Sequence, residues 1–250
     1  MKNFTQIDIK PQLMSTPNPR IGVVALSTDF TIEQDFRRVC HNLPVDIFTN
    51  RIPFENPLNH QNYLKMLDHL PEVVDDILPN EKLDTVAYGC TSGTVAIGEN
   101  VIASQIHKSK PNTYVTTPIS AALRAFEQLN IKKISVLAPY PKEVNETVFN
   151  YFLKKHIEVK NFSSFNLNYD SEIAMVEPNH LISTIKDMSY LDSDAIFVSC
   201  TALRIVEVLQ EAESIIQKTI ISSNQAMIWD SIRSVKINTK IHNFGKLFLN

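Results

Sequence analysis

The chain carries one short pattern twice. Residues 84–94 read DTVAYGCTSGT and residues 194–204 read DAIFVSCTALR, so that an acid, an apolar run and a Cys-Thr pair recur at Cys90 and at Cys200. Repetition of this kind indicates two similar structural units in one chain. It therefore constrains the fold more than any single segment does.

The repeat extends beyond the cysteines. PRIGVVAL at 19–26 resembles KKISVLAP at 132–139, and NTYVTTPISAALRAF at 112–126 resembles KTIISSNQAMIWDSI at 218–232. Three blocks in the same order predict two pseudo-symmetric lobes. We expect residues 1–117 to form the first lobe, with Cys90, completed by residues 219–250. Residues 118–218 are expected to form the second lobe, with Cys200.

Short apolar runs rich in β-branched residues predict strands that are buried on both faces. They lie at 20–26, 85–89, 114–117, 133–139, 195–200 and 219–223. Segments with helical spacing lie between and after them, at 31–40, 64–78, 94–109, 120–130, 144–156, 178–188 and 202–216. Strands that alternate with helices predict an α/β fold in which helices flank a small, parallel, doubly wound sheet in each lobe. The active site is expected between the lobes.

Composition excludes several classes of function. A net charge of −3 gives no basic surface for nucleic acid. No apolar run approaches the ~18 to 20 residues that span a bilayer, and the first 20 residues show no signal or transit pattern. We therefore expect a cytoplasmic protein without nucleic-acid or membrane partners. The charged residues Glu33, Asp35 and Arg37 are expected on a solvated face or in an inter-lobe salt bridge.

No cofactor or metal is expected. The 3 cysteines are an odd number without a C-x-x-C pair, which argues against a disulfide framework and a zinc site. The 7 histidines have no metal-binding spacing, and the 5 glycines form no nucleotide-binding loop.

Each repeated cysteine follows a predicted strand and precedes a predicted helix. Ligands bind at the carboxyl ends of strands in parallel sheets, and a helix N-terminus would hold a carboxylate and favour the thiolate. The hydroxyls of Thr91, Ser92 and Thr201 would donate to the same anion. If the lobes face each other, the sulfurs of Cys90 and Cys200 would flank one small ligand, and one could remove a proton while the other side returns one.

Five pieces of the chain carry a family resemblance: VVALSTDFTIEQDFRR, AYGCTSGTVAIGE, VLAPY, VSCTALR and ISSNQAMIWDSIR. They resemble the Asp/Glu racemase superfamily, in particular its branch of maleate cis-trans isomerases, arylmalonate decarboxylases and ectoine-utilisation racemase-like proteins. The resemblance covers most of the chain. It implies two pseudo-symmetric α/β lobes with the site between them, and a homo-oligomer.

The resemblance also assigns roles to residues. It implies that Cys90 and Cys200 are catalytic, that Thr91 and Ser92 bind a substrate carboxylate, and that Tyr140 binds substrate. The decarboxylases lack a cysteine at the first position, so Cys90 counts against their chemistry.

Two positions depart from the isomerase pattern, because Asp29 and Asp170 stand where asparagines occur in the family. An ionised aspartate accepts hydrogen bonds only, so it would repel a second carboxylate and attract an ammonium. This favours an amino acid or a related amino-carboxylate as substrate. The alternative role for Asp29 is to cap the helix that follows it.

Three functional hypotheses follow. The first is a cofactor-independent two-cysteine racemase or isomerase that acts at a carbon adjacent to a carboxylate. The second is a cis-trans isomerisation of maleate in which Cys90 adds covalently to the alkene and Cys200 protonates it. The third is a non-catalytic binding protein whose lobes close around a small carboxylate.

Overall fold

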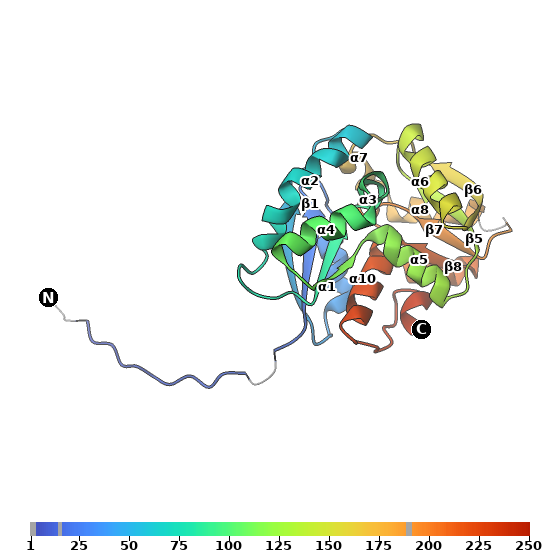
Figure 1. Cartoon of the computed structure of the whole chain (residues 1–250). Helices are drawn as coiled ribbons and strands as arrows, with labels where there is room; N and C mark the ends of the chain where they lie inside the picture. Colours follow the sequence, from blue (N-terminus) through green and yellow to red (C-terminus); the bar gives the residue numbers. More distant parts are fainter. Residues whose placement is uncertain (1–3, 15–16, 189–191) are drawn as a thin grey trace.

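The computed structural model describes residues 4–14, 17–188 and 192–250. It contains two four-stranded parallel sheets, ordered β2-β1-β3-β4 and β6-β5-β7-β8. Because the strand order is the same in both, the second sheet repeats the first strand for strand. Helices cover the sheets, and residues 4–14 extend away from the two lobes (Figure 1). The predicted α/β fold of two pseudo-symmetric lobes is confirmed.

The first sheet and its helices run from residue 20 to residue 116. The strands are β1 (Arg20–Leu26), β2 (Asp46–Ile52), β3 (Thr85–Gly89) and β4 (Tyr114–Thr116). The helices are α1 (Ile32–Cys40), α2 (His60–Asp75), α3 (Thr91–Ile97) and α4 (Glu99–Ser109). The central strand β3 is buried at every position, as its apolar run predicts.

The second sheet comprises β5 (Lys133–Ala138), β6 (Glu158–Ser164), β7 (Ala195–Val198) and β8 (Thr219–Ser222). Its helices, including the two that join the lobes, are α5 (Pro118–Gln128), α6 (Lys142–Lys154), α7 (Asp170–Ile173), α8 (Pro178–Met188), α9 (Leu209–Ile216) and α10 (Ser223–Ser234). A short 3-10 helix, η1 (Lys246–Leu249), follows near the C-terminus. No helix in the described ranges is long and apolar enough to cross a membrane.

The sequence patterns miss the edge strands β2 and β6. Each pairs on one side only, with β1 and β5 respectively, and each is partly exposed along most of its length. Their sequences, DIFTNRI and EVKNFSS, mix polar and apolar residues because only part of each strand is covered. The continuous apolar run that marks the central strands is therefore absent.

Two helix predictions are corrected by the structure. The helix expected over 94–109 breaks at Gly98, which has a φ of 97° and separates α3 from α4. The helix expected over 202–216 begins only at Leu209, and turns occupy the residues between Cys200 and that point. The apolar side chains of Leu203, Ile205 and Val206 are all buried there, so their helical spacing marks a buried loop.

The chain crosses between the lobes after β4 and after β8. β8 pairs with β7 in the second sheet, so the return to the first lobe expected at Thr219 occurs one strand later, at Ser223. The helix α10 that starts there contacts α1, β3 and β4 of the first lobe. α10 also packs along α5, which joins the first lobe to the second (Figure 1). This helix pair ties the two lobes together.

Candidate active site

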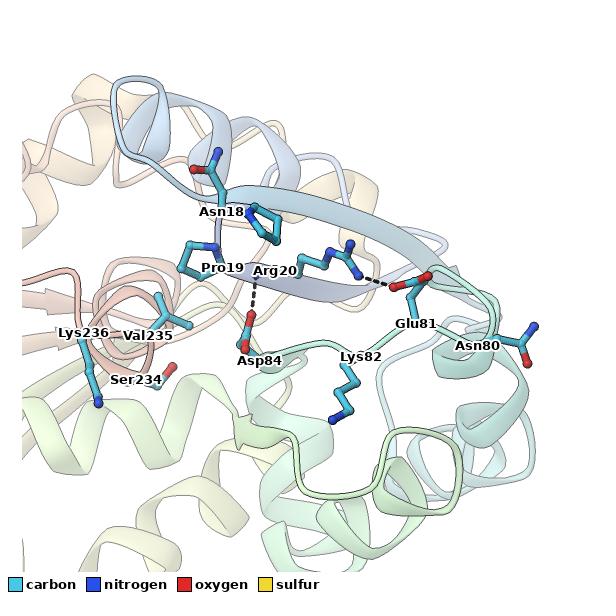
Figure 2. Close-up of a pocket in the computed structure, with 11 residues that line it drawn as sticks. Asn18, Pro19, Arg20, Asn80, Glu81, Lys82, Asp84, Ser234, Val235 and Lys236 are labelled. Carbon is cyan, nitrogen blue, oxygen red and sulfur yellow. Dashed lines mark hydrogen bonds and ion pairs between the residues drawn. The ribbon is translucent and has the colours of Figure 1, made fainter. Parts of the chain in front are cut away.

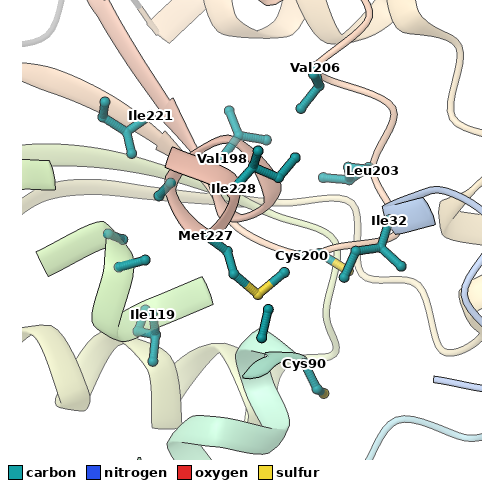
Figure 3. Close-up of a cluster of buried hydrophobic side chains, with 14 of the residues drawn as sticks. Ile32, Cys90, Ile119, Val198, Cys200, Leu203, Val206, Ile221, Met227 and Ile228 are labelled. Atoms are coloured by element: carbon teal, nitrogen blue, oxygen red, sulfur yellow. The ribbon is translucent and has the colours of Figure 1, made fainter. Parts of the chain in front are cut away.

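The two repeated cysteines occupy equivalent places in the two sheets. Cys90 follows β3 directly, and Cys200 follows β7 after Ser199, so both lie at the carboxyl end of a central strand. Their exposed fractions are 3% and 6%. Figure 3 shows both thiols in one buried region, beside Met227 of α10.

Hydrogen bonds link the two Cys-Thr pairs through Ser223 and through Gly89. The Ser223 hydroxyl accepts from Thr91 Oγ1 at 2.9 Å and from the Cys200 backbone N–H at 3.0 Å. From the second motif, Thr201 Oγ1 donates to the carbonyl of Gly89, the residue before Cys90, at 3.4 Å. The two motifs therefore lie close together in the fold, as predicted. The hydroxyls of Thr91 and Thr201 are engaged within the protein.

Cys90 caps the helix that follows it. Its Sγ accepts the Gly93 backbone N–H at 3.2 Å at the start of α3. Burial nevertheless raises the pKa of the Cys90 thiol to about 12, because the loss of hydration outweighs that single N–H. The expectation that this site favours the thiolate is therefore wrong for the structure as it stands.

Cys200 has a different setting, because no helix begins beside it. Its backbone φ is 104°, and its Sγ accepts the Ala202 backbone N–H at 3.4 Å. Burial raises the pKa of the Cys200 thiol well above the usual value, and the charge of Asp170 adds to this effect. The helix N-terminus expected at this cysteine is absent, because the chain turns into the buried loop described above.

Asp29 caps the helix that follows it, which is one of the two roles that its sequence suggests. Its Oδ1 accepts the backbone N–H groups of Thr31 at 2.6 Å and Ile32 at 2.8 Å, which caps α1. Its Oδ2 is buried and has no hydrogen-bond partner among the described residues. Burial raises the pKa of Asp29, and the two N–H groups oppose the change. One carboxylate oxygen is thus left free to accept from a ligand.

Asp170 lies at the start of α7, and its Oδ2 accepts from the Thr28 hydroxyl. Burial raises the pKa of Asp170 to about 6, with the hydrogen bond from Thr28 acting against burial and the charge of Asp29 acting with it. The charges of both aspartates raise the pKa values of Cys90 and Cys200. The four groups therefore form one electrostatically coupled cluster.

Two buried phenols complete the cluster. The Tyr140 hydroxyl lies 3.2 Å from Ser199 Oγ, and Ser92 Oγ donates to the Tyr63 hydroxyl at 2.9 Å. Burial raises the pKa values of both tyrosines well above the usual range, and a thiolate at Cys90 or Cys200 would act in the same direction. Both phenols therefore stay protonated and remain available as hydrogen-bond donors.

Sequence reasoning missed Tyr63 and Ser223. Tyr63 follows a loop that the periodicity of the sequence cannot place. On α2 it has the spacing of an ordinary core residue. Ser223 begins α10 in a segment whose repeat partner starts with a proline, Pro118. The alignment of Ser222 and Ser223 with Thr116 and Thr117 in the repeat was the available signal, but it does not show which hydroxyl faces the cysteines.

The site is covered by contacts between the lobes. Leu58 N donates to the Asn168 carbonyl at 3.0 Å, and Asp170 N donates to Asn56 Oδ1 at 3.4 Å. Beneath this cover, the rings of Phe54 and Tyr63 stack with centroids 5.6 Å apart. An opening of about 20 Å³ borders Tyr63, which is room for little more than one water molecule. Cys90 and Cys200 are themselves nearly closed off from solvent.

A larger hollow lies at the opposite ends of the strands. It has a volume of about 780 Å³ and is lined by residues that include Arg20, Glu81 and Asp84 (Figure 2). Arg20 pairs with Glu81 at 2.6 Å, and its backbone N–H binds Asp84 at 2.8 Å. Ligands bind at the carboxyl ends of parallel strands. This hollow is at the amino ends and contains none of the predicted site residues.

Among residues 4–14, 17–188 and 192–250, no three His, Cys, Asp or Glu side chains come together in a way that could hold a metal ion. The chemistry of the cluster is that of thiols, carboxyls and phenols.

Comparison with known proteins places the chain in a family. The family model described as arylmalonate decarboxylase matches residues 96–248. The chain belongs to the arylmalonate decarboxylase family. The maleate isomerase of Alcaligenes faecalis is 21% identical over 241 residues, which cover 91% of this chain and 95% of that protein.

Solved structures agree with this assignment at the level of the fold. The maleate isomerase Iso from Pseudomonas putida S16 superposes with a TM-score of 0.83 at 18% identity, covering 93% of this chain and 98% of that one. A mutant maleate cis-trans isomerase from Nocardia farcinica, with a covalently bound succinylcysteine intermediate, gives 0.83 at 15% identity and covers 92% and 98%.

Membership of the arylmalonate decarboxylase family confirms the resemblance found in the sequence, namely the maleate isomerase and arylmalonate decarboxylase branch of the Asp/Glu racemase-like superfamily. It also confirms the expectation of an enzyme. Membership of the family does not identify the substrate, which must be inferred from the charges at the site.

Proposed function

We propose that this protein is an isomerase that acts at a carbon adjacent to a carboxylate, with Cys90 and Cys200 as its acid-base pair. The observation that carries the proposal is the joining of the two Cys-Thr pairs through Ser223 in one buried cluster. Equivalent positions on two similar lobes are suited to opposed proton transfers at one carbon. Opposed transfers invert a stereocentre without oxidation or reduction.

The proposed reaction moves one proton in each direction. One sulfur, as thiolate, takes the proton from the carbon next to the carboxylate, and the bonding electrons pass onto that carboxylate. The other thiol then gives its proton to the opposite face of the carbon. Hydrogen bonds from the phenols of Tyr63 and Tyr140 would stabilise the negative charge that develops on the carboxylate, and the Ser92 hydroxyl, which donates to Tyr63, would orient that phenol.

The charges around the thiols favour an amino acid or a related amino-carboxylate. The groups that most affect the pKa of Cys90 and of Cys200 include Asp29 and Asp170 and no cation. An ammonium group on the substrate would supply the missing positive charge and would lower the thiol pKa values. Asp29 Oδ2, buried without a partner, is a free acceptor for such a group.

A second candidate is the cis-trans isomerisation of maleate, which is the activity named for the relatives. The succinylcysteine of the Nocardia farcinica protein indicates the chemistry. Here the Cys90 thiolate would add to one alkene carbon while the Cys200 thiol protonates the other. After rotation, the Cys200 thiolate would take a proton back and Cys90 would leave as a thiolate, which restores both cysteines. The two aspartates oppose this candidate, because their negative charges would repel the second carboxylate.

One experiment separates the candidates. The protein is incubated in deuterated water with a panel of L-amino acids and with maleate, and proton NMR follows each compound. We expect loss of the α-proton signal of an amino acid through exchange with solvent deuterium. Conversion of maleate to fumarate without any amino-acid exchange would favour the second candidate. A folded protein that changes no compound in the panel would contradict the proposed substrate classes.

A further inference from the structure

The backbone at Cys200 adopts a conformation that residues with a side chain rarely take. Its φ of 104° lies in the region that favours glycine. Such a conformation persists only where the surrounding structure holds it. The contacts that hold this loop therefore determine the direction of the Cys200 thiol.

Three hydrogen bonds to side chains outside the loop hold its backbone. Ser223 Oγ accepts the Cys200 N–H at 3.0 Å, as described above. The Ala202 carbonyl accepts from Thr31 Oγ1 at 3.0 Å. The Thr201 carbonyl accepts from Asn224 Nδ2 at 2.8 Å. The first and third of these contacts come from consecutive residues at the start of α10.

Asn224 is itself held by a carboxylate from the first lobe. Its Nδ2 donates to Asp35 Oδ2 at 2.8 Å, and both side chains are buried. Asp35 lies on α1, where the sequence predicts a solvated face or an inter-lobe salt bridge. The structure instead buries Asp35 completely, pairs it at 3.2 Å with Arg38 of the same helix, and joins it to α10 by the hydrogen bond from Asn224.

Stability does not explain why this position carries an ionisable side chain, whose pKa burial raises to about 7. Replacing a buried ion pair by apolar residues of similar size is often neutral or stabilising. A carboxylate, however, provides an acceptor that fixes the orientation of the Asn224 amide. We propose that Asp35 is a positioning residue, which acts through Asn224 and the Thr201 carbonyl to hold the Cys200 thiol in place for the reaction proposed above.

The test compares the reactivity of two thiols in the same molecule. The protein is treated with iodoacetamide, and peptide mass spectrometry gives the alkylation rates of Cys200 and Cys90. In Asp35→Leu the loop is released, so Cys200 should react about tenfold faster relative to Cys90, the change expected from losing one hydrogen bond to a charged group. Asp35→Asn keeps an acceptor for Asn224 and should leave the ratio near that of the unmodified sequence.

A matched control is available on α10. Asp230 is also a buried carboxylate that joins two elements, because it accepts from Arg124 Nε and Nη2 of α5, each at 2.7 Å. It makes no contact with the Cys200 loop among the interactions of the described residues. Asp230→Leu should therefore leave the Cys200 to Cys90 ratio unchanged. An equal change in this variant would show a general loosening and would overturn the proposal.

A second variant removes the same link from its other end. Asn224→Ala should raise the ratio as Asp35→Leu does, and the double variant should add nothing, because both act through one chain of contacts. Circular dichroism checks that each variant folds. A folded Asn224→Ala protein with an unchanged ratio would overturn the proposal even if Asp35→Leu failed to fold.

The alkylation ratio and the turnover report on different claims. If the ratio changes as expected and Cys200 is catalytic, Asp35→Leu should also lower kcat while KM stays similar, because the thiol is misplaced. A changed ratio in a protein that turns over no member of the substrate panel would support the positioning role and count against the proposed function.

Discussion

At the scale of single residues, burial opposes negative charge throughout the site. It raises the pKa values of Cys90, Cys200, Asp29 and Asp170, and no cation is among the groups that act most strongly on the two thiols. A bound ammonium would relieve this imbalance, whereas a second carboxylate would increase it. The protonation state of the aspartates should therefore control which ligands the site accepts.

If the charge of Asp170 controls ligand binding, kcat/KM should depend on pH. Its pKa is raised to about 6, so its carboxyl is largely neutral at pH 5 and charged at pH 7. For an amino-acid substrate, kcat/KM should rise with pH through about 6, because the charged form attracts the ammonium. For a dicarboxylate, kcat/KM should fall over the same range. Steady-state kinetics from pH 5 to pH 8 measures both.

The variant Asp170→Asn should remove this titration and should lower kcat/KM for an amino acid at pH 7 by roughly 10- to 100-fold, as expected when a buried charge partner is lost. The matched control is Glu172→Gln, which keeps a side-chain acceptor on the same short helix. A pH profile that is the same in Asp170→Asn and in the unmodified protein would exclude Asp170 as its source.

The sequence predicts part of the site for a clear physical reason. Cys90, Cys200, Thr91 and Thr201 belong to a repeated motif, and repetition is visible without any structure. Tyr63, Ser223 and Asn224 come from segments that give no such signal, and only the crossing of α10 into the first lobe brings two of them to the cysteines. The change in thiol pKa also depends on burial, which the motif alone does not show.

At the scale of elements, the two halves of the repeat differ after the cysteine. α3 begins at once after Cys90, whereas turns follow Cys200 and α9 starts only at Leu209. The central strands were predicted because both of their faces are buried, whereas the edge strands β2 and β6 were missed because each is partly exposed along most of its length. The two thiols are therefore held by different means, one by a helix and one by a network of side chains.

Gly93 of α3 tests how closely the first thiol is held. A Cβ at this position would lie 2.7 Å from Cys90 Sγ and 3.0 Å from Met66 Cε. We expect Gly93→Ala to displace the sulfur and to lower kcat/KM by roughly 100-fold, since a 1 Å misplacement can have that effect. The overpacking should also cost about 1–3 kcal/mol of unfolding free energy, measured by urea denaturation.

Ser104→Ala on the exposed face of α4 is the control for a small change nearby, and it should alter neither quantity. A Gly93→Ala protein with full activity would show that the position of the Cys90 sulfur is less restricted than the helix start implies.

At the scale of the whole molecule, the lobes share helices, while the N-terminal segment stands apart. Residues 4–14 are exposed, and the one hydrogen bond of their side chains within the described ranges joins Gln6 to Asp8. The apolar residues Phe4, Ile7, Ile9, Leu13 and Met14 are each more than three-quarters exposed. The homo-oligomer implied by the family resemblance stays a prediction, for which this segment is one available contact surface.

Deletion of residues 1–16 should leave the fold intact, because the described part of this segment adds no buried contact to the lobes. Urea denaturation should give the same midpoint for the shortened and full-length proteins. A clear loss of stability at equal protein concentration would show that the segment packs on the lobes or on a second copy of the chain.

The central claim is that Cys90 and Cys200 act on the same carbon from the two lobes. The most direct measurement follows deuterium incorporation from solvent into the substrate, by proton NMR, for the unmodified protein, Cys90→Ser and Cys200→Ser. The account predicts inversion with exchange in the unmodified protein, and loss of turnover by at least about 100-fold in each folded variant. Inversion at an undiminished rate in either variant would contradict it.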